Sequence, residues 1–396
     1  MIPQSMVCIA GRLVIVLLGA ALATCAAFST DGGIGSYGGE RGTLGPSPKP
    51  GSRLAETEAH RGEPGWLAGN AGQVASTARD VLRHEPLDAV ALRQLAELSP
   101  NSPDRMRDLL RLSERVTRRD TTGQILLINL AAGANNFGEA VAHYDRAISV
   151  LPRLGPTLLP YLANGLTDPQ VLKELPRFAT RPWFRPLLAQ GIEQGAPISA
   201  VAELALSARA RLPAEERAAF SAELIDRLLV LKRHADVRAL VVRLGGTQRS
   251  TLDDLAISAA TTDSGYPALS WRLTDDGTTR AEFLPPSGLA ITVAPAGSGI
   301  AAMRRTLLQP GSYRLQMRVT YDPASPRATV SLVLECLDGQ TIWKAEIAND
   351  RESVSKDASF DIPQRCTLQT WRLDVDADDS QFASVARITT ISLRPL

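Results

Sequence analysis

In "GSYRLQMRVT", residues 311–320, apolar and polar side chains alternate without a break. A period of two residues places successive side chains on opposite faces of a strand. The apolar face then has a core to cover, and the polar face meets water. This stretch therefore predicts a half-buried strand whose inner face carries Tyr313, Leu315, Met317 and Val319.

The same alternation continues on both sides of this stretch. It returns in "ATVSLVLEC" (328–336) and "TIWKAEIA" (341–348), while "WRLDV" (371–375) and "VARITTISLRP" (385–395) end the chain. Further strands are expected near residues 270, 283 and 291. Gly, Pro and Asp at the connections are typical turn residues. Roughly eight short strands of this kind predict an antiparallel β-sandwich over residues 262–396.

The period changes to that of helices over residues 66–258. Segments such as "GQVASTARDVLRHEP" (72–86) and "FGEAVAHYDRAISVLP" (137–152) place small and apolar residues on one face and end at a proline. Helix, short turn and helix then repeat, which is typical of an α–α superhelix. The fold class expected is multidomain, α followed by β.

Residues 70–154 resemble a tetratricopeptide repeat protein. The first-helix leucine is Leu127, and steps of four, three and five residues recur along the second helices. Gln124, Ile128 and Ala131 stand where the family has Trp, Gly and Tyr. The resemblance implies that the helices bind a protein partner. Its matching positions are Ala140, Tyr144, Ala147 and Pro152, with Val74, Ala78, Val81 and Pro86 and with Met106, Leu110 and Ser113 as further copies.

The β region resembles jelly-roll modules of the galactose-binding or carbohydrate-binding kind. The resemblance rests on the number of strands, on "PGSYRL" (310–315) and on the late strand that follows Cys366. It implies a glycan ligand. No cofactor is expected, and a structural calcium ion, which modules of this kind often hold, is the alternative.

The N-terminal part predicts export. Residues 13–28 form an apolar run behind Arg12, which suits either a cleaved signal peptide or a single retained membrane anchor. Residues 29–65 are rich in Gly and Pro and read as a disordered spacer. Either fate places the rest of the chain in the periplasm, free or anchored and facing it.

The two cysteines beyond that segment are Cys336 and Cys366. In an exported protein, an even pair within one β domain predicts a disulfide, with free core thiols as the alternative.

The aromatic residues of the β region are candidates for stacking on sugar rings. Trp371 is the leading one, because an apparent slip in the alternation there predicts a bulge that turns the ring outwards. Arg372 is its neighbour, and Trp343 and Trp271 are further candidates. The alternative is that these rings fill the core of the sandwich.

Charged residues give weaker candidates. Arg107, Arg111 and Arg115 step along one helix and could hold an anionic polymer, or could simply pair with nearby acids on a solvated face. Asp374, Asp376 and Asp378 resemble the start of a calcium loop, but residue 385, where a closing Glu is needed, is Val. No metal site is therefore predicted beyond this weak alternative.

The chain carries a formal net charge of +1 and only four histidines, and nucleic acid is not an expected partner. No catalytic motif is present, so no catalytic residue is proposed. The leading hypothesis is a non-enzymatic exported adaptor in the cell envelope, close to polysaccharide synthesis or export. Its helices would bind a protein partner and its sandwich a glycan or a neighbouring protein. The alternatives are a carbohydrate-binding protein with the helices as scaffold, and a carbohydrate-active enzyme.

Overall fold

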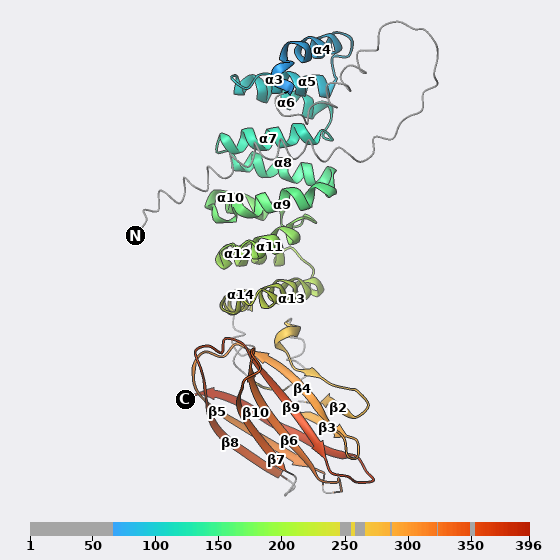
Figure 1. Cartoon of the computed structure of the whole chain (residues 1–396), viewed down its shortest axis with the longest axis vertical. Coiled ribbons are helices and arrows are strands. Elements are labelled where there is room, and N and C mark those ends of the chain that lie inside the picture. The colour runs from blue at the N-terminus through green and yellow to red at the C-terminus, as the bar shows by residue number, and fades with distance from the viewer. Residues whose placement is uncertain (1–65, 246–254, 258–265, 286, 323, 349–352) are drawn as a thin grey trace, which may run out of the picture. The chain divides into compact units, whose positions relative to one another are not determined.

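The computed structural model describes residues 66–396 except 246–254, 258–265, 286, 323 and 349–352 (Figure 1). The predicted signal or anchor (1–28) and spacer (29–65) lie outside the described residues. The described chain divides into two compact units, and the boundary between Ala200 and Val201 falls inside a helix. The secondary structure changes from helices to strands as predicted, although the last helices belong to the same unit as the strands.

Helices make up the described part of the first unit and the beginning of the second. In chain order they are α3 (Trp66–Gly69), α4 (Ala71–His84), α5 (Ala89–Glu97), α6 (Pro103–Val116), α7 (Thr121–Gly133), α8 (Phe137–Val150), α9 (Gly155–Asn164), α10 (Pro169–Glu174), α11 (Phe184–Glu193), α12 (Ile198–Arg209), α13 (Ala214–Val230) and α14 (His234–Gly245). Among the described residues, no helix has both the length and the apolar character that a membrane span requires.

The small residues singled out by the repeat pattern lie in the helical core. Val74, Ala78 and Val81 are buried on α4, and Ala140, Tyr144 and Ala147 are buried on α8. On α6, Leu110 and Ser113 occupy the corresponding buried positions. These helices therefore use equivalent faces for packing, and membership of the tetratricopeptide family stays a prediction.

A polar network explains why Gln124 stands where the family has Trp. Gln124 is 1% exposed, and its side chain bonds to His143 at 2.9 Å and donates to Glu114 at 3.1 Å. Arg146 also donates to Glu114, at 2.7 Å. Burial raises the pKa of Glu114, but hydrogen bonds from His143 and Gln124 and the nearby charges outweigh it and lower that pKa to about 2. A Trp at residue 124 would remove these partners.

The sandwich of the second unit contains two five-stranded sheets. We call them the β9 sheet, with strand order β1-β4-β9-β6-β7, and the β10 sheet, with order β2-β3-β10-β5-β8. The strands are β1 (Arg272–Leu273), β2 (Thr279–Phe283), β3 (Leu289–Val293), β4 (Ser298–Thr306), β5 (Gly311–Tyr321), β6 (Ala328–Cys336), β7 (Thr341–Ala348), β8 (Ser353–Ile362), β9 (Gln369–Ala377) and β10 (Ser384–Pro395). All described strand pairs in these sheets are antiparallel, as predicted.

The core lies between the sheets and follows the predicted alternation. Tyr313, Leu315, Met317 and Val319 of β5 all point into it. Strands β4 and β8 were not predicted. The first carries Gly, Ala and Met in place of branched residues, and the second is a polar strand at the edge of its sheet. Edge strands bury little, so their sequence keeps a weak pattern.

Candidate functional site

The structure corrects the assignment of Trp371 as a ring that stacks on sugars. Trp371 is 0% exposed, and its ring meets the Phe360 ring edge-on, with the two ring centroids 5.7 Å apart. Its Nε1 donates to Thr306 Oγ1 at 3.0 Å. No bulge separates β9 from β6 here, because the pairing runs in register from Cys336 opposite Gln369 to Ala328 opposite Ala377. Trp371 is a core residue.

The other tryptophan candidates also belong to the interior. Trp271 is 3% exposed and donates from Nε1 to the Leu255 carbonyl at 3.2 Å, so it too is corrected. Trp343 is half-buried and packs on Phe360 at 5.5 Å. The Trp271 ring is therefore closed to a ligand, and the Trp343 ring is partly covered by the core.

One exposed aromatic side chain was missed by the sequence analysis. Phe382 is 71% exposed and lies in the connection from β9 to β10. It follows Asp378, Asp379 and Ser380 in a segment where apolar and polar residues do not alternate. These polar neighbours are the sign in the sequence that the Phe382 ring is exposed.

Over β6, β7 and β9, the outer face of the β9 sheet pairs its charges internally. Arg372 lies 3.1 Å from Glu335 and donates to Asp374 at 2.7 Å. The hydrogen bond with Asp374 and the neighbouring negative charges raise the pKa of Arg372. Lys344 and Glu346 form a second pair at 2.5 Å. Arg372, a predicted ligand-binding residue, is therefore already neutralised by two carboxylates.

The proposed calcium residues do not converge on one point. Asp374 bonds to Arg372, Asp376 lies further along the outer face of β9, and Asp378 lies beyond the end of the strand. Within the described parts of the chain, no group of His, Cys, Asp or Glu side chains is arranged to hold a metal ion. The weak calcium alternative therefore has no support from these three residues.

The outer face of the β10 sheet is different, because its central strands carry arginines and no acids. The sequences of β5 and β10 contain neither Asp nor Glu. Arg318, Arg387 and Arg394 are exposed, and within the described structure none of them lies within ion-pair distance of a carboxylate. Arg318 donates only to Ser355 Oγ, at 3.2 Å. This face offers free guanidinium groups to a ligand.

Strand register brings two of these like charges together. Arg394 of β10 stands opposite Arg314 of β5, a pairing that is unfavourable between adjacent strands. Asp357 of β8 offsets it by accepting hydrogen bonds from Arg314 Nε at 2.8 Å and Nη2 at 2.6 Å. These hydrogen bonds lower the pKa of Asp357 and raise that of Arg314.

The arginines predicted on the helix are placed on α6. Arg107 pairs with Asp104 at 2.8 Å, and Arg111 pairs with Glu139 at 2.9 Å. Arg115 is exposed and has no ion-pair partner in the described residues. Two of these three arginines therefore pair with nearby acids, which agrees with the alternative prediction of a solvated face with paired charges.

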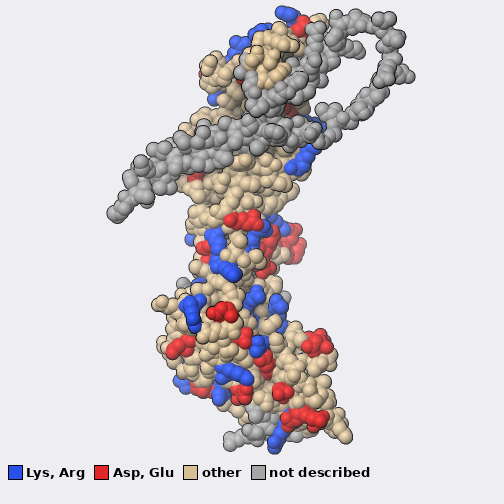
Figure 2. All heavy atoms as spheres, viewed as in Figure 1, with Lys and Arg blue, Asp and Glu red and all other residues tan. Residues whose placement is uncertain are grey.

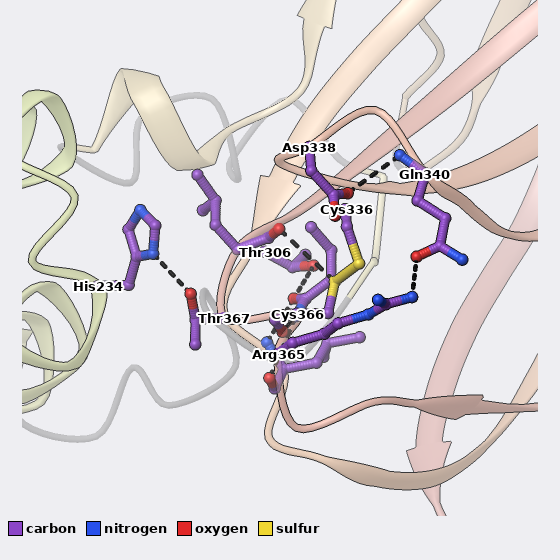
Figure 3. Close-up of a disulfide and its surroundings, with 11 residues drawn as sticks. His234, Thr306, Cys336, Asp338, Gln340, Arg365, Cys366 and Thr367 are labelled. Atoms are coloured by element: carbon purple, nitrogen blue, oxygen red, sulfur yellow. Dashed lines mark hydrogen bonds between the residues drawn. A yellow bond between two sulfur atoms is a disulfide. The ribbon is translucent and has the colours of Figure 1, made fainter.

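The predicted disulfide is confirmed. Cys336, at the end of β6, is bonded to Cys366, which lies just before β9, with a Cα–Cα separation of 5.4 Å (Figure 3). Beside it, His234 at the start of α14 bonds to Thr367 Oγ1 at 2.8 Å, so this loop also contacts the last helix. Burial and the charge of Lys232 lower the pKa of His234.

Charges of both signs lie on one face of the described molecule. On the face shown in Figure 2, basic and acidic side chains are interspersed, without one extended patch of a single sign. The arginine-rich face of the β10 sheet is therefore a local feature, in a chain whose formal net charge is +1.

Comparisons with known proteins give likeness of fold only. No protein-family model matches the chain, and no curated protein matches it. A solved CBM4 structure is 10% identical over 33% of this chain and 88% of its own, with a TM-score of 0.26. TmCBM61, solved with β-1,4-galactotriose, is 13% identical over 32% and 88%, with a TM-score of 0.25. The CBM22-1 xylan-binding domain of Paenibacillus barcinonensis Xyn10C is 12% identical over 32% and 85%, with a TM-score of 0.23.

These neighbours are carbohydrate-binding modules that match the β-sandwich part of the chain. At such TM-scores the likeness carries no argument about what this chain binds.

Proposed function

We propose that this chain is an exported, non-enzymatic binding protein whose sandwich holds an acidic polysaccharide on the outer face of the β10 sheet. One observation carries the proposal, namely the exposed arginines on β5 and β10, two adjacent strands without a single acidic residue.

The spacing of these arginines suits an extended polyanion. From Arg314 to Thr320, which stands opposite Arg387, the face extends about 20 Å at 3.4 Å per residue. Arg318 lies between these ends. A guanidinium group binds a carboxylate through parallel hydrogen bonds, so each free arginine can hold one acidic sugar.

The remaining side chains of this face suit the neutral parts of a sugar. Hydroxyl and amide groups between the arginines can donate to and accept from sugar hydroxyls. The face has no exposed aromatic ring among its described strand residues, which disfavours stacking of nucleic acid bases. The polar groups are Gln316, Thr320, Thr390 and Ser392 on the central strands, with Ser353 and Ser355 on β8.

Export is part of the proposal and rests on separate observations. A disulfide is typical of proteins that fold in an oxidising compartment. The apolar run of residues 13–28 would deliver the chain there, as a free periplasmic protein or as an anchored one.

Affinity electrophoresis of the full chain in gels with polygalacturonate or with neutral xylan tests the function. We expect retardation by polygalacturonate that weakens as salt is added, because screening acts on exposed charges. Equal retardation by both polymers, or by neither, would contradict the proposal.

A second candidate function is the binding of a protein partner by the helices. Arg105 and Arg115 of α6 are exposed and have no ion-pair partner among the described residues, so this helix can bind an acidic surface. A pull-down from envelope extract with wild type and with Arg105→Glu/Arg115→Glu tests it. Loss of the same band from the variant is the expected result, and an unchanged band set would reject the role.

A further inference from the structure

A small pocket lies on the outer face of the β9 sheet, beside the 3-10 turn Pro267–Leu269. Its volume is about 70 Å³, and Arg272, Met303, Arg305 and Thr370 contribute to its lining. Strand register places these side chains together, since Arg272 stands opposite Met303 and Arg305 stands opposite Thr370. Ser270 and Arg304 complete the polar part of the lining.

The lining is positively charged and contains no carboxylate. Arg304 is 3% exposed and donates to the Ala256 carbonyl at 3.3 Å, so a buried cation lies under the pocket. Arg272 and Arg305 are exposed, and in the described part of the chain neither lies within ion-pair distance of a carboxylate.

The nearest opposing charge comes from a helix. Asp226 of α13 interacts electrostatically with Arg305. Burial raises the pKa of Asp226, and the charge of Arg305 lowers it only in part. This carboxylate therefore reduces the positive potential at the pocket from one side without lining it.

From this geometry we infer that the pocket binds a single oxyanion group, held between the Arg272 and Arg305 guanidinium groups with the Thr370 hydroxyl as a further donor. The volume exceeds the 10–15 Å³ that one water needs, and it suits a carboxylate, phosphate or sulfate group better than a whole sugar ring. The group could belong to a sugar acid or to a phosphate ester. The site is separate from the β10 sheet, so either site can fail without the other.

Isothermal titration of the full chain with inorganic phosphate and with monomeric galacturonate, at constant ionic strength in chloride, tests this inference. We expect saturable binding of at least one probe, and the tighter probe identifies the source of the group. Arg272→Gln/Arg305→Gln should weaken binding by about tenfold or more, because two charge-assisted contacts are lost. The matched control, Arg118→Gln/Arg119→Gln just after α6, also removes two exposed arginines and should bind the same probe unchanged.

Two further variants separate the pocket from a general charge effect. Met303→Phe keeps every charge and fills the space, so it should also weaken binding. Asp226→Asn removes the opposing charge and should strengthen binding several-fold. No saturable binding of either probe, equal weakening in the Arg118→Gln/Arg119→Gln control, or no gain with Asp226→Asn would overturn the inference.

Discussion

The outer face of the β10 sheet and the part of the β9 sheet formed by β6, β7 and β9 cover the same core and treat charge in opposite ways. On the β9 sheet, Arg372 is shared between Glu335 and Asp374, and Lys344 pairs with Glu346. On the β10 sheet, the central strands carry arginines opposite hydroxyls and, in one case, opposite another arginine. The first arrangement satisfies the protein alone, and the second leaves charges that a ligand can satisfy.

This difference indicates which surface of the sandwich can bind a ligand when its described tryptophans are buried or half-buried. A surface ion pair contributes little to stability, so either arrangement of surface charge is compatible with a stable fold. A row of unpaired like charges, however, is unfavourable until an anion neutralises it. The residues that distinguish the faces are therefore better candidates for binding than the tryptophans that the faces share as core.

The largest expected effect tests that shared core. Trp371→Ala should lower the free energy of unfolding by about 3–5 kcal/mol, because it removes a fully buried ring and leaves a cavity. Urea denaturation followed by tryptophan fluorescence measures this loss, with Lys344→Gln as a surface control. A stable Trp371→Ala protein that has lost only ligand binding would return this ring to the binding site.

The next effect concerns the disulfide, which joins the end of β6 to the segment before β9. Cys336→Ala/Cys366→Ala should lower the free energy of unfolding by about 3–4 kcal/mol, as chain entropy predicts for a bridge over a sequence separation of 30. Polysaccharide binding should persist wherever the variant is folded. Denaturation curves with and without reductant measure the loss, and curves that coincide for variant and wild type would show that the bridge adds no stability.

A smaller effect separates the faces directly. Arg318→Gln/Arg387→Gln/Arg394→Gln should weaken the binding of polygalacturonate by about tenfold or more, because charge-assisted hydrogen bonds are lost. It should also flatten the dependence of affinity on salt. Titration calorimetry is the measurement, and the β9-sheet variant Lys344→Gln is the control. If the control loses as much affinity as the triple variant, the two faces do not differ as proposed.

The smallest effect has the opposite sign. Asp357→Asn should strengthen the binding of polygalacturonate about two- to fivefold, since it releases Arg314 from an exposed ion pair of ordinary strength. The pKa of Asp357 lies below its usual value, so in the wild type the carboxylate is ionised at neutral pH and holds Arg314. Weaker binding by the variant at neutral pH would mean that Asp357 itself contacts the ligand.

The sequence predicts the sandwich well where strands lie over the core, as in β5, because burial on one face enforces alternation. It fails at Trp371 because Gln369, a polar residue, points inwards with 0% exposure and bonds to the Leu308 and Cys366 backbones. This buried polar side chain makes the alternation of apolar and polar residues along β9 look shifted by one position. The disulfide followed from compartment and spacing.

The arginine-rich face could not be predicted. Arg314 and Arg394 are 80 positions apart in the numbering and meet only through the register of β5 and β10. The same holds for Arg272 and Arg305, which the pairing of β1 and β4 brings to one pocket. Residues on different strands become neighbours through the order and register of the strands. The residue pattern along a single strand does not predict which residues these are.

Arginine footprinting tests whether an acidic polysaccharide binds the outer face of the β10 sheet. The full chain is treated with a glyoxal reagent with and without polygalacturonate, and modified arginines are quantified by mass spectrometry. We predict protection of Arg318, Arg387 and Arg394, with Arg372 and Arg105 modified equally in both samples. Protection of Arg372 while the β10-sheet arginines remain fully reactive would contradict the account.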